Sequence, residues 1–136
     1  MEILSRSPLV ILDGGHNPQC WEALSKALRQ LLGSRKAVLL TGVLADKEYD
    51  LLPGYFEDIA QEYICVTPVS DRALSSEDLA SFLSGKGAKA TPFSAIADGI
   101  QAALTAAGPD GIVVIFGSLY LAGAVRSQFR KSYPID

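Results

Sequence analysis

Apolar residues gather along the chain in short unbroken runs, and each run is followed by a longer stretch in which apolar positions recur with helical spacing. An unbroken apolar run bounded by turn residues is typical of a strand that is buried on both faces of a sheet. The sequence therefore predicts five strands, at residues 8–12, 37–44, 63–67, 89–93 and 111–116.

The stretches between these runs carry signals of helix ends. Asn17 and Pro18 predict an N-cap followed by proline at the first helical position, and Gly33 predicts the end of that helix. Further helices are predicted from Asp46 to about Gln61 with a kink at Pro53-Gly54, and at residues 75–84, 94–107 and 118–132. Apolar faces of the first and last helices are predicted at Trp21, Leu24, Leu28 and Leu31, and at Leu119, Ala122, Val125 and Phe129.

Strands that alternate with helices predict a parallel sheet, because parallel neighbours need a crossover connection. Right-handed crossovers place helices on both faces of such a sheet. The predicted fold class is α/β, a single open, doubly wound, mostly parallel, Rossmann-like sheet of about five strands. The 136 residues correspond to one domain, and 49% apolar residues can support a core at this size.

Composition narrows the possible partners. The formal net charge of −3 gives no basic surface for nucleic acid. No apolar run approaches the roughly 20 residues of a membrane span, and no signal peptide is recognisable. Cys20 and Cys65 are interpreted as reduced thiols, and a single histidine without a CxxC pair argues against zinc. We expect a cytoplasmic protein.

Two predicted strand-to-helix loops carry chemistry, at residues 13–17 and 117–120. Ligands of open α/β sheets bind beyond the carboxyl ends of the strands, where both loops would lie. Each residue alone has an ordinary explanation: an Asx turn for Asp13, a surface position for His16, an N-cap for Ser118 and an edge aromatic for Tyr120. Residues 46–48 would ordinarily be a solvated helix start. Their placement at one edge favours a function.

The common phosphate-binding and nucleophile motifs are missing. Gly85-Lys86-Gly87 lacks the earlier glycine and the hydroxyl of a P-loop, and no G-x-G-x-x-G follows a strand. Gly117-Ser118 is not a G-x-S-x-G nucleophile elbow, and no cluster of acidic residues suggests a Mg²⁺ site. Without these motifs, the residues of the two loops account for only half of a binding site.

Four segments resemble the folylpolyglutamate synthase and dihydrofolate synthase family. Residues 12–18, LDGGHNP, are similar to its LDGAHNP signature, and residues 42–48 to its G-x-x-x-DKD segment. Residues 66–73 contain its TP and RA pairs, and residues 116–123, FGSLYLAG, its GSLYLAG stretch. The chain departs from the family at Gly15, usually alanine, and at Glu48, usually aspartate.

The resemblance covers the C-terminal domain of that family, which is related to the C-terminal domain of the Mur ligases. It implies that residues 1–136 are one domain of a larger two-domain ligase, whose ATPase domain holds the P-loop and Mg²⁺. Such a ligase uses ATP to activate a folate carboxylate as an acyl phosphate, and L-glutamate then forms the amide as phosphate leaves. The isolated chain is expected to be inactive and the full enzyme a monomer.

The resemblance also implies roles for particular residues. It assigns Asp13 to ATP, and it assigns His16, Ser118 and Tyr120 to glutamate. No catalytic residue or metal ligand is assigned to this domain. A role in supporting the loops that carry the site is assigned to Gly14, Gly15, Asn17, Asp46, Lys47, Arg72 and Gly117.

Two other functions remain open. A Mur-type amino-acid ligase shares the fold but joins a different acid and amino acid, and the GSLYLAG stretch favours the folate branch over it. A stand-alone ligand-binding module without chemistry is the second alternative. Whether the full enzyme also makes dihydrofolate is left open.

Overall fold

The unbroken apolar runs form the middle of a six-stranded sheet in the computed structural model, which describes residues 1–132. The strands are β1 (Glu2–Arg6), β2 (Leu9–Leu12), β3 (Ala37–Thr41), β4 (Ala60–Val66), β5 (Ala90–Phe93) and β6 (Ile112–Phe116). The helices are α1 (Pro18–Leu32), α2 (Leu52–Phe56), α3 (Ser76–Gly85), α4 (Ile96–Ala107) and α5 (Leu119–Ser132), with a 3₁₀ turn η1 at Tyr49–Leu51. None of these helices has the length and apolar character that a membrane crossing requires.

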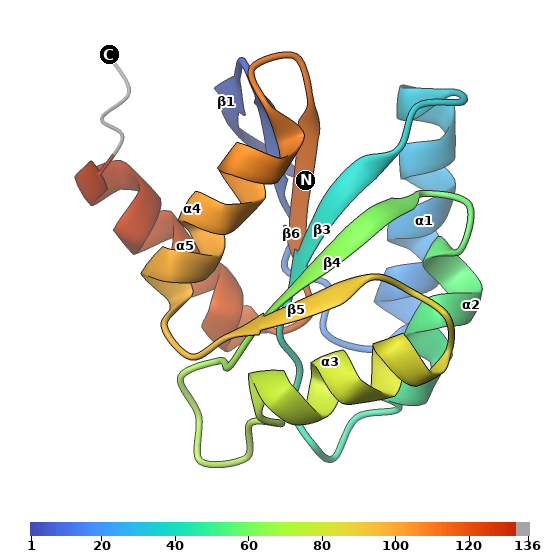
Figure 1. Ribbon diagram of the computed structural model, residues 1–136, viewed down its shortest axis with the longest axis vertical. Coiled ribbons are helices and arrows are strands. Elements are labelled where there is room, and N and C mark those ends of the chain that lie inside the picture. The colour runs from blue at the N-terminus through green and yellow to red at the C-terminus, as the bar shows by residue number, and fades with distance from the viewer. Residues whose placement is uncertain (133–136) are drawn as a thin grey trace.

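The strands lie in the order β1-β2-β6-β3-β4-β5, and all pairs except β1 with β2 are parallel. Strand β6 therefore lies between β2 and β3, although it is the last strand in the chain. Helices α1, α2 and α3 cover one face, and α4 and α5 cover the other (Figure 1). The predicted doubly wound α/β class is confirmed.

The predicted helix ends agree with the structure at two caps. The Asn17 side chain accepts a hydrogen bond from the backbone N–H of Cys20, with Pro18 at the first helical position. Ser75 caps α3 in the same way through the N–H of Asp78. The predicted apolar faces contain two errors, because Leu31 is 56% exposed and Leu119 is 60% exposed. Leu32 and Leu121 are buried in their place.

The helix predicted from Asp46 to about Gln61 is wrong. Residues 45–47 form a turn, η1 and α2 are short, and β4 already begins at Ala60. Pro53 lies in the first turn of α2, where proline starts a helix rather than kinking one. The preceding strand is also shorter than predicted and ends at Thr41.

Strand β1 was not predicted. It pairs antiparallel with β2 at the edge of the sheet, and it is only five residues long. Only Leu4 of this strand is buried, while the neighbouring Ile3 is 49% exposed. A single buried side chain gives too weak a period-2 pattern to identify an edge strand.

Candidate functional site

The neighbouring parallel strands β2, β6 and β3 end at the same edge of the sheet, and the segments that follow them continue to opposite faces. The chains that leave β2 and β3 continue into α1 and α2, on one face. The chain that leaves β6, between them, continues into α5 on the other face. A crevice forms beyond the carboxyl ends of strands at such a reversal, and ligands of open α/β sheets bind there.

The two loops predicted to carry chemistry are joined by backbone hydrogen bonds. The N–H of Asp13 donates to the carbonyl of Ile115 at 2.9 Å, and the N–H of Gly117 donates to the carbonyl of Gly15 at 2.9 Å. The Gly15 carbonyl also accepts from the indole N–H of buried Trp21 at 3.1 Å. The prediction that loops 13–17 and 117–120 form one surface is thereby confirmed.

Gly117 permits the close approach of the loops that follow β6 and β3. Its φ is 128°, a backbone conformation that other residues rarely adopt. A Cβ at this position would lie 2.5 Å from the Gly42 carbonyl oxygen and 2.5 Å from Thr41 Oγ1. The Thr41 hydroxyl itself donates to the carbonyl of Phe116 at 2.8 Å, which ties the end of β3 to the end of β6.

A cavity of about 480 Å³ lies at this edge, and we call it the site cavity. Its walls come from the loops after four strands: β2, β3, β4 and β6. No carboxylate is among the described residues that line it. The lining residues are His16, Leu44, Lys47, Arg72, Ser118, Leu119 and Tyr120.

The site cavity is lined by all three residues that the family resemblance assigns to glutamate. Ser118 is buried, and its Oγ accepts the N–H of Leu121 at 2.9 Å, which caps α5. Because a hydroxyl both accepts and donates, Ser118 can still donate to a ligand. Nδ1 of His16 lies 3.3 Å from the Gly14 carbonyl oxygen. When Nδ1 carries the proton, this contact leaves Nε2 free to accept a hydrogen bond.

Lys47 and Arg72 line the site cavity from two loops that are bonded to each other. Leu44 and Ala73 form an isolated antiparallel bridge between the loops after β3 and β4. Nη1 of Arg72 lies 2.9 Å from Oδ2 of Asp46, so Asp46 pairs across the loops instead of capping a helix as predicted. Lys47 is half-buried and has no ion pair among residues 1–132.

Asp13 lies beside the site cavity rather than in its wall. Its Oδ1 accepts the N–H of Gly15 at 2.7 Å, which is the Asx turn considered as its ordinary role. Its Oδ2 lies 3.8 Å from the amino group of Met1. Its predicted contact with ATP stays a prediction. A Cβ on Gly15 would lie 3.1 Å from Asp13 Oδ1, so an alanine there needs only a small shift.

Sequence reasoning missed the two apolar walls of the site cavity. Leu44 was placed in a strand, and Leu119 was placed on the buried face of a helix. The signal for Leu119 was its position directly after the N-cap residue Ser118, in the first turn of the helix. No local pattern indicates Leu44, because its place depends on the bridge to Ala73.

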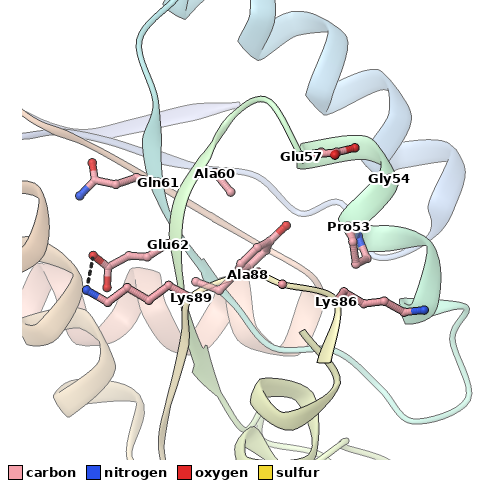
Figure 2. A pocket seen from close by; sticks show the side chains of 11 residues that line it. Pro53, Gly54, Glu57, Ala60, Gln61, Glu62, Lys86, Ala88 and Lys89 are labelled. Carbon is pink, nitrogen blue, oxygen red and sulfur yellow. Dashed lines mark ion pairs between the residues drawn. The ribbon is translucent and has the colours of Figure 1, made fainter. Parts of the chain in front are cut away.

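A second cavity of about 410 Å³ lies at the opposite edge of the sheet, where β4 and β5 begin (Figure 2). Glu62 and Lys89 form an ion pair there at 3.7 Å. Buried Tyr63 also lines it, and burial raises the pKa of its phenol, which therefore stays neutral. This cavity contains none of the predicted site residues and lies at the edge that ligands of such sheets do not use.

Comparisons with known proteins agree with this geometry. Residues 1–119 match the family described as Mur ligase, glutamate ligase domain. A folylpolyglutamate synthase of Lacticaseibacillus casei is 36% identical over 133 residues, covering 93% of this chain and 28% of that protein.

Two solved structures are similar across nearly the whole chain. The Mycobacterium tuberculosis folylpolyglutamate synthase complexed with ADP is 27% identical with a TM-score of 0.85, covering 94% of this chain and 31% of the other. A bifunctional folylpolyglutamate synthase/dihydrofolate synthase with Mn, AMPPNP and L-glutamate bound is 26% identical with a TM-score of 0.74, covering 93% and 30%. The chain thus spans less than a third of each of these relatives.

Proposed function

Because the chain belongs to the Mur ligase glutamate ligase domain family, we propose that it is the C-terminal domain of a two-domain, ADP-forming folylpolyglutamate synthase. In the proposed reaction, ATP transfers its terminal phosphoryl group to a folate carboxylate, which gives an acyl phosphate and ADP. The amino group of L-glutamate then attacks the acyl carbon, and phosphate leaves as the amide forms. The site cavity is the observation that carries this proposal.

The lining of the site cavity suits an anionic amino acid. Lys47 and Arg72 bring basic side chains to its wall, and Ser118 supplies a hydroxyl donor. The N-termini of α1 and α5 lie at the same edge, where free N–H groups and the helix dipole favour carboxylates. We assign His16, Ser118 and Tyr120, which all line the site cavity, to glutamate.

ATP and a divalent cation are the proposed cofactors. The similar structures were solved with ADP, or with AMPPNP and Mn, which supports nucleotide and metal use. No group of three or more His, Cys, Asp or Glu side chains among residues 1–132 could hold a metal ion. From the resemblance to the folate ligases we assign the metal ligands to the ATPase domain and Asp13 to the nucleotide, where a carboxylate oxygen can accept from hydroxyl donors.

The test is an activity assay of the longest open reading frame that encodes this chain. It is supplied with ATP, Mg²⁺ and L-glutamate, and phosphate release and glutamylated product are measured with a reduced folate and, separately, with dihydropteroate. Glutamylation of the reduced folate is the expected result. Product from dihydropteroate would add a dihydrofolate synthase activity, and turnover of neither acid would overturn the proposal.

We also propose that the ligase works in the cytoplasm as a monomer. Cys20 and Cys65 are both free, which is typical of a reducing compartment. Size-exclusion chromatography with light scattering of the same reading frame tests the oligomeric state.

A further inference from the structure

Trp21 is the single tryptophan of the chain, and its side chain is 0% exposed. It lies near the start of α1, on the face that packs against the sheet. The indole N–H donates to the carbonyl of Gly15 at 3.1 Å, and a Cβ on Gly15 would lie 3.6 Å from Cδ1 of the ring. A buried indole N–H needs an acceptor, and here the acceptor is backbone of the loop that carries His16. Helix α1 thus holds the loop that precedes it.

The Gly15 carbonyl joins two loops of the site. It accepts the indole N–H of Trp21 and also the N–H of Gly117, which lies 2.9 Å away. A carbonyl oxygen has two lone pairs, so it can accept from both donors at once. His16 follows Gly15 in the chain and Ser118 follows Gly117, and both of them line the site cavity. The two hydrogen bonds therefore fix the placement of these lining residues relative to each other.

The orientation of this carbonyl determines where His16 lies. The carbonyl of Gly15 and the N–H of His16 belong to one planar peptide unit. Rotation of that unit would move His16, and consecutive glycines at positions 14 and 15 offer little resistance to such rotation. Asp13 is anchored separately, because its own N–H donates to the carbonyl of Ile115 at 2.9 Å. The indole N–H should therefore influence His16 more than Asp13.

We propose that Trp21 is a positioning residue, whose indole N–H holds the Gly15–His16 peptide unit so that His16 is placed to bind the amino-acid substrate. Trp21 acts through His16, since it does not itself line the site cavity. This inference rests on the proposed ligase function and on the assignment of His16 to glutamate. It goes beyond them by giving a residue of the core an effect on substrate affinity.

The experiment removes the N–H and keeps the shape of the ring. In the full-length reading frame, position 21 receives benzothienylalanine, in which sulfur replaces the indole N–H, or fluorotryptophan, which keeps the N–H. Leu28→Ala is the control for lost packing, because Leu28 is fully buried on the same helix and in the same core cluster. The kcat and the KM values for L-glutamate and ATP are measured, and circular dichroism melting checks that each variant is folded.

Benzothienylalanine is expected to raise the KM for L-glutamate about 3- to 10-fold, the size of one lost hydrogen bond between uncharged groups, and to leave the KM for ATP within about twofold. Fluorotryptophan, as the conservative variant, should restore the KM for L-glutamate. Leu28→Ala should lower the melting temperature and leave both KM values unchanged, because it removes packing without freeing the loop.

A double substitution tests whether Trp21 acts through His16. In the His16→Ala enzyme, benzothienylalanine should cause no further increase in the KM for L-glutamate, since the two groups act as one unit. Additive increases would overturn the proposal, and so would equal increases in both KM values or unchanged constants in a folded variant. If the analogue prevents folding, Trp21→Phe, which also lacks the N–H, takes its place in the same comparison. An unsubstituted enzyme that adds no glutamate would instead refute the proposed function.

Discussion

Replacing Gly117 by alanine tests whether the loops at the carboxyl edge approach as closely as the structure shows. The new Cβ would lie 2.5 Å from the Gly42 carbonyl oxygen, about 1 Å inside ordinary contact. The residue would also have to keep a φ of 128°, which costs alanine about 1–3 kcal/mol. Relieving the overlap adds about 1–3 kcal/mol more. We therefore expect Gly117→Ala to lower the free energy of unfolding by about 2–6 kcal/mol.

The matched control is Gly123→Ala, in the middle of α5. No atom lies within 4 Å of a Cβ at that position, and its φ is not positive. Alanine is a better helix former than glycine, so this variant should be more stable by about 0.5–1 kcal/mol. The two substitutions add the same methyl group and should change stability in opposite directions.

Urea unfolding of the 136-residue chain, followed by circular dichroism, measures both variants. With a typical slope of about 1–3 kcal/mol per molar urea, Gly117→Ala should move the midpoint downward by about 1 M or more. A Gly117→Ala midpoint equal to that of the unsubstituted chain would refute the close approach of residues 41–42 to residue 117. The same variant in the full enzyme should weaken glutamate binding, because Ser118 follows directly.

Four further outcomes are expected. In the full enzyme, His16→Ala should raise the KM for glutamate more than the KM for ATP, whereas Asp13→Ala should do the opposite; equal effects on both constants would contradict these roles. Burial raises the pKa of the Cys65 thiol to about 12, so at pH 8 iodoacetamide should modify Cys65 only after unfolding, while half-buried Cys20 reacts in the native chain. Since the folded pKa of Cys65 lies above its ordinary value of 9.0, the stability that this thiol adds is complete below pH 9 and declines as the pH rises toward 12, which alkaline unfolding measures. The 136-residue chain should fold alone yet release no phosphate from ATP with glutamate and folate; turnover by it would contradict the proposed domain assignment.

The parts of the fold that sequence predicted correctly are those whose signal is local. The strands near the centre of the sheet are buried on both faces, so their apolar runs are continuous and mark them clearly. Asn17-Pro18 identified the start of α1 because both residues act within one helical turn. The edge strand β1 was missed because only Leu4 on it is buried.

The composition of the site cavity was only half predictable for a related reason. His16 and Ser118 lie within four residues of the ends of β2 and β6, so the rule that ligands bind at the carboxyl ends of strands locates them. Lys47 and Arg72 lie several residues beyond their strands, on loops whose path depends on the Leu44–Ala73 bridge and on the Asp46 ion pair. Contacts of that kind between distant segments have no signature in the sequence of either loop.

The open side of the site cavity is bordered by Leu119, 60% exposed, and Tyr120, 51% exposed. Large exposed apolar side chains at a cavity are typical of a surface that another part of a protein covers. In the proposed ligase, the ATPase domain would cover this rim and exclude the water that hydrolyses an acyl phosphate. The loops of this domain would then supply only part of the glutamate pocket. Glutamate should accordingly bind weakly to this domain alone and tightly once the other domain has closed over it.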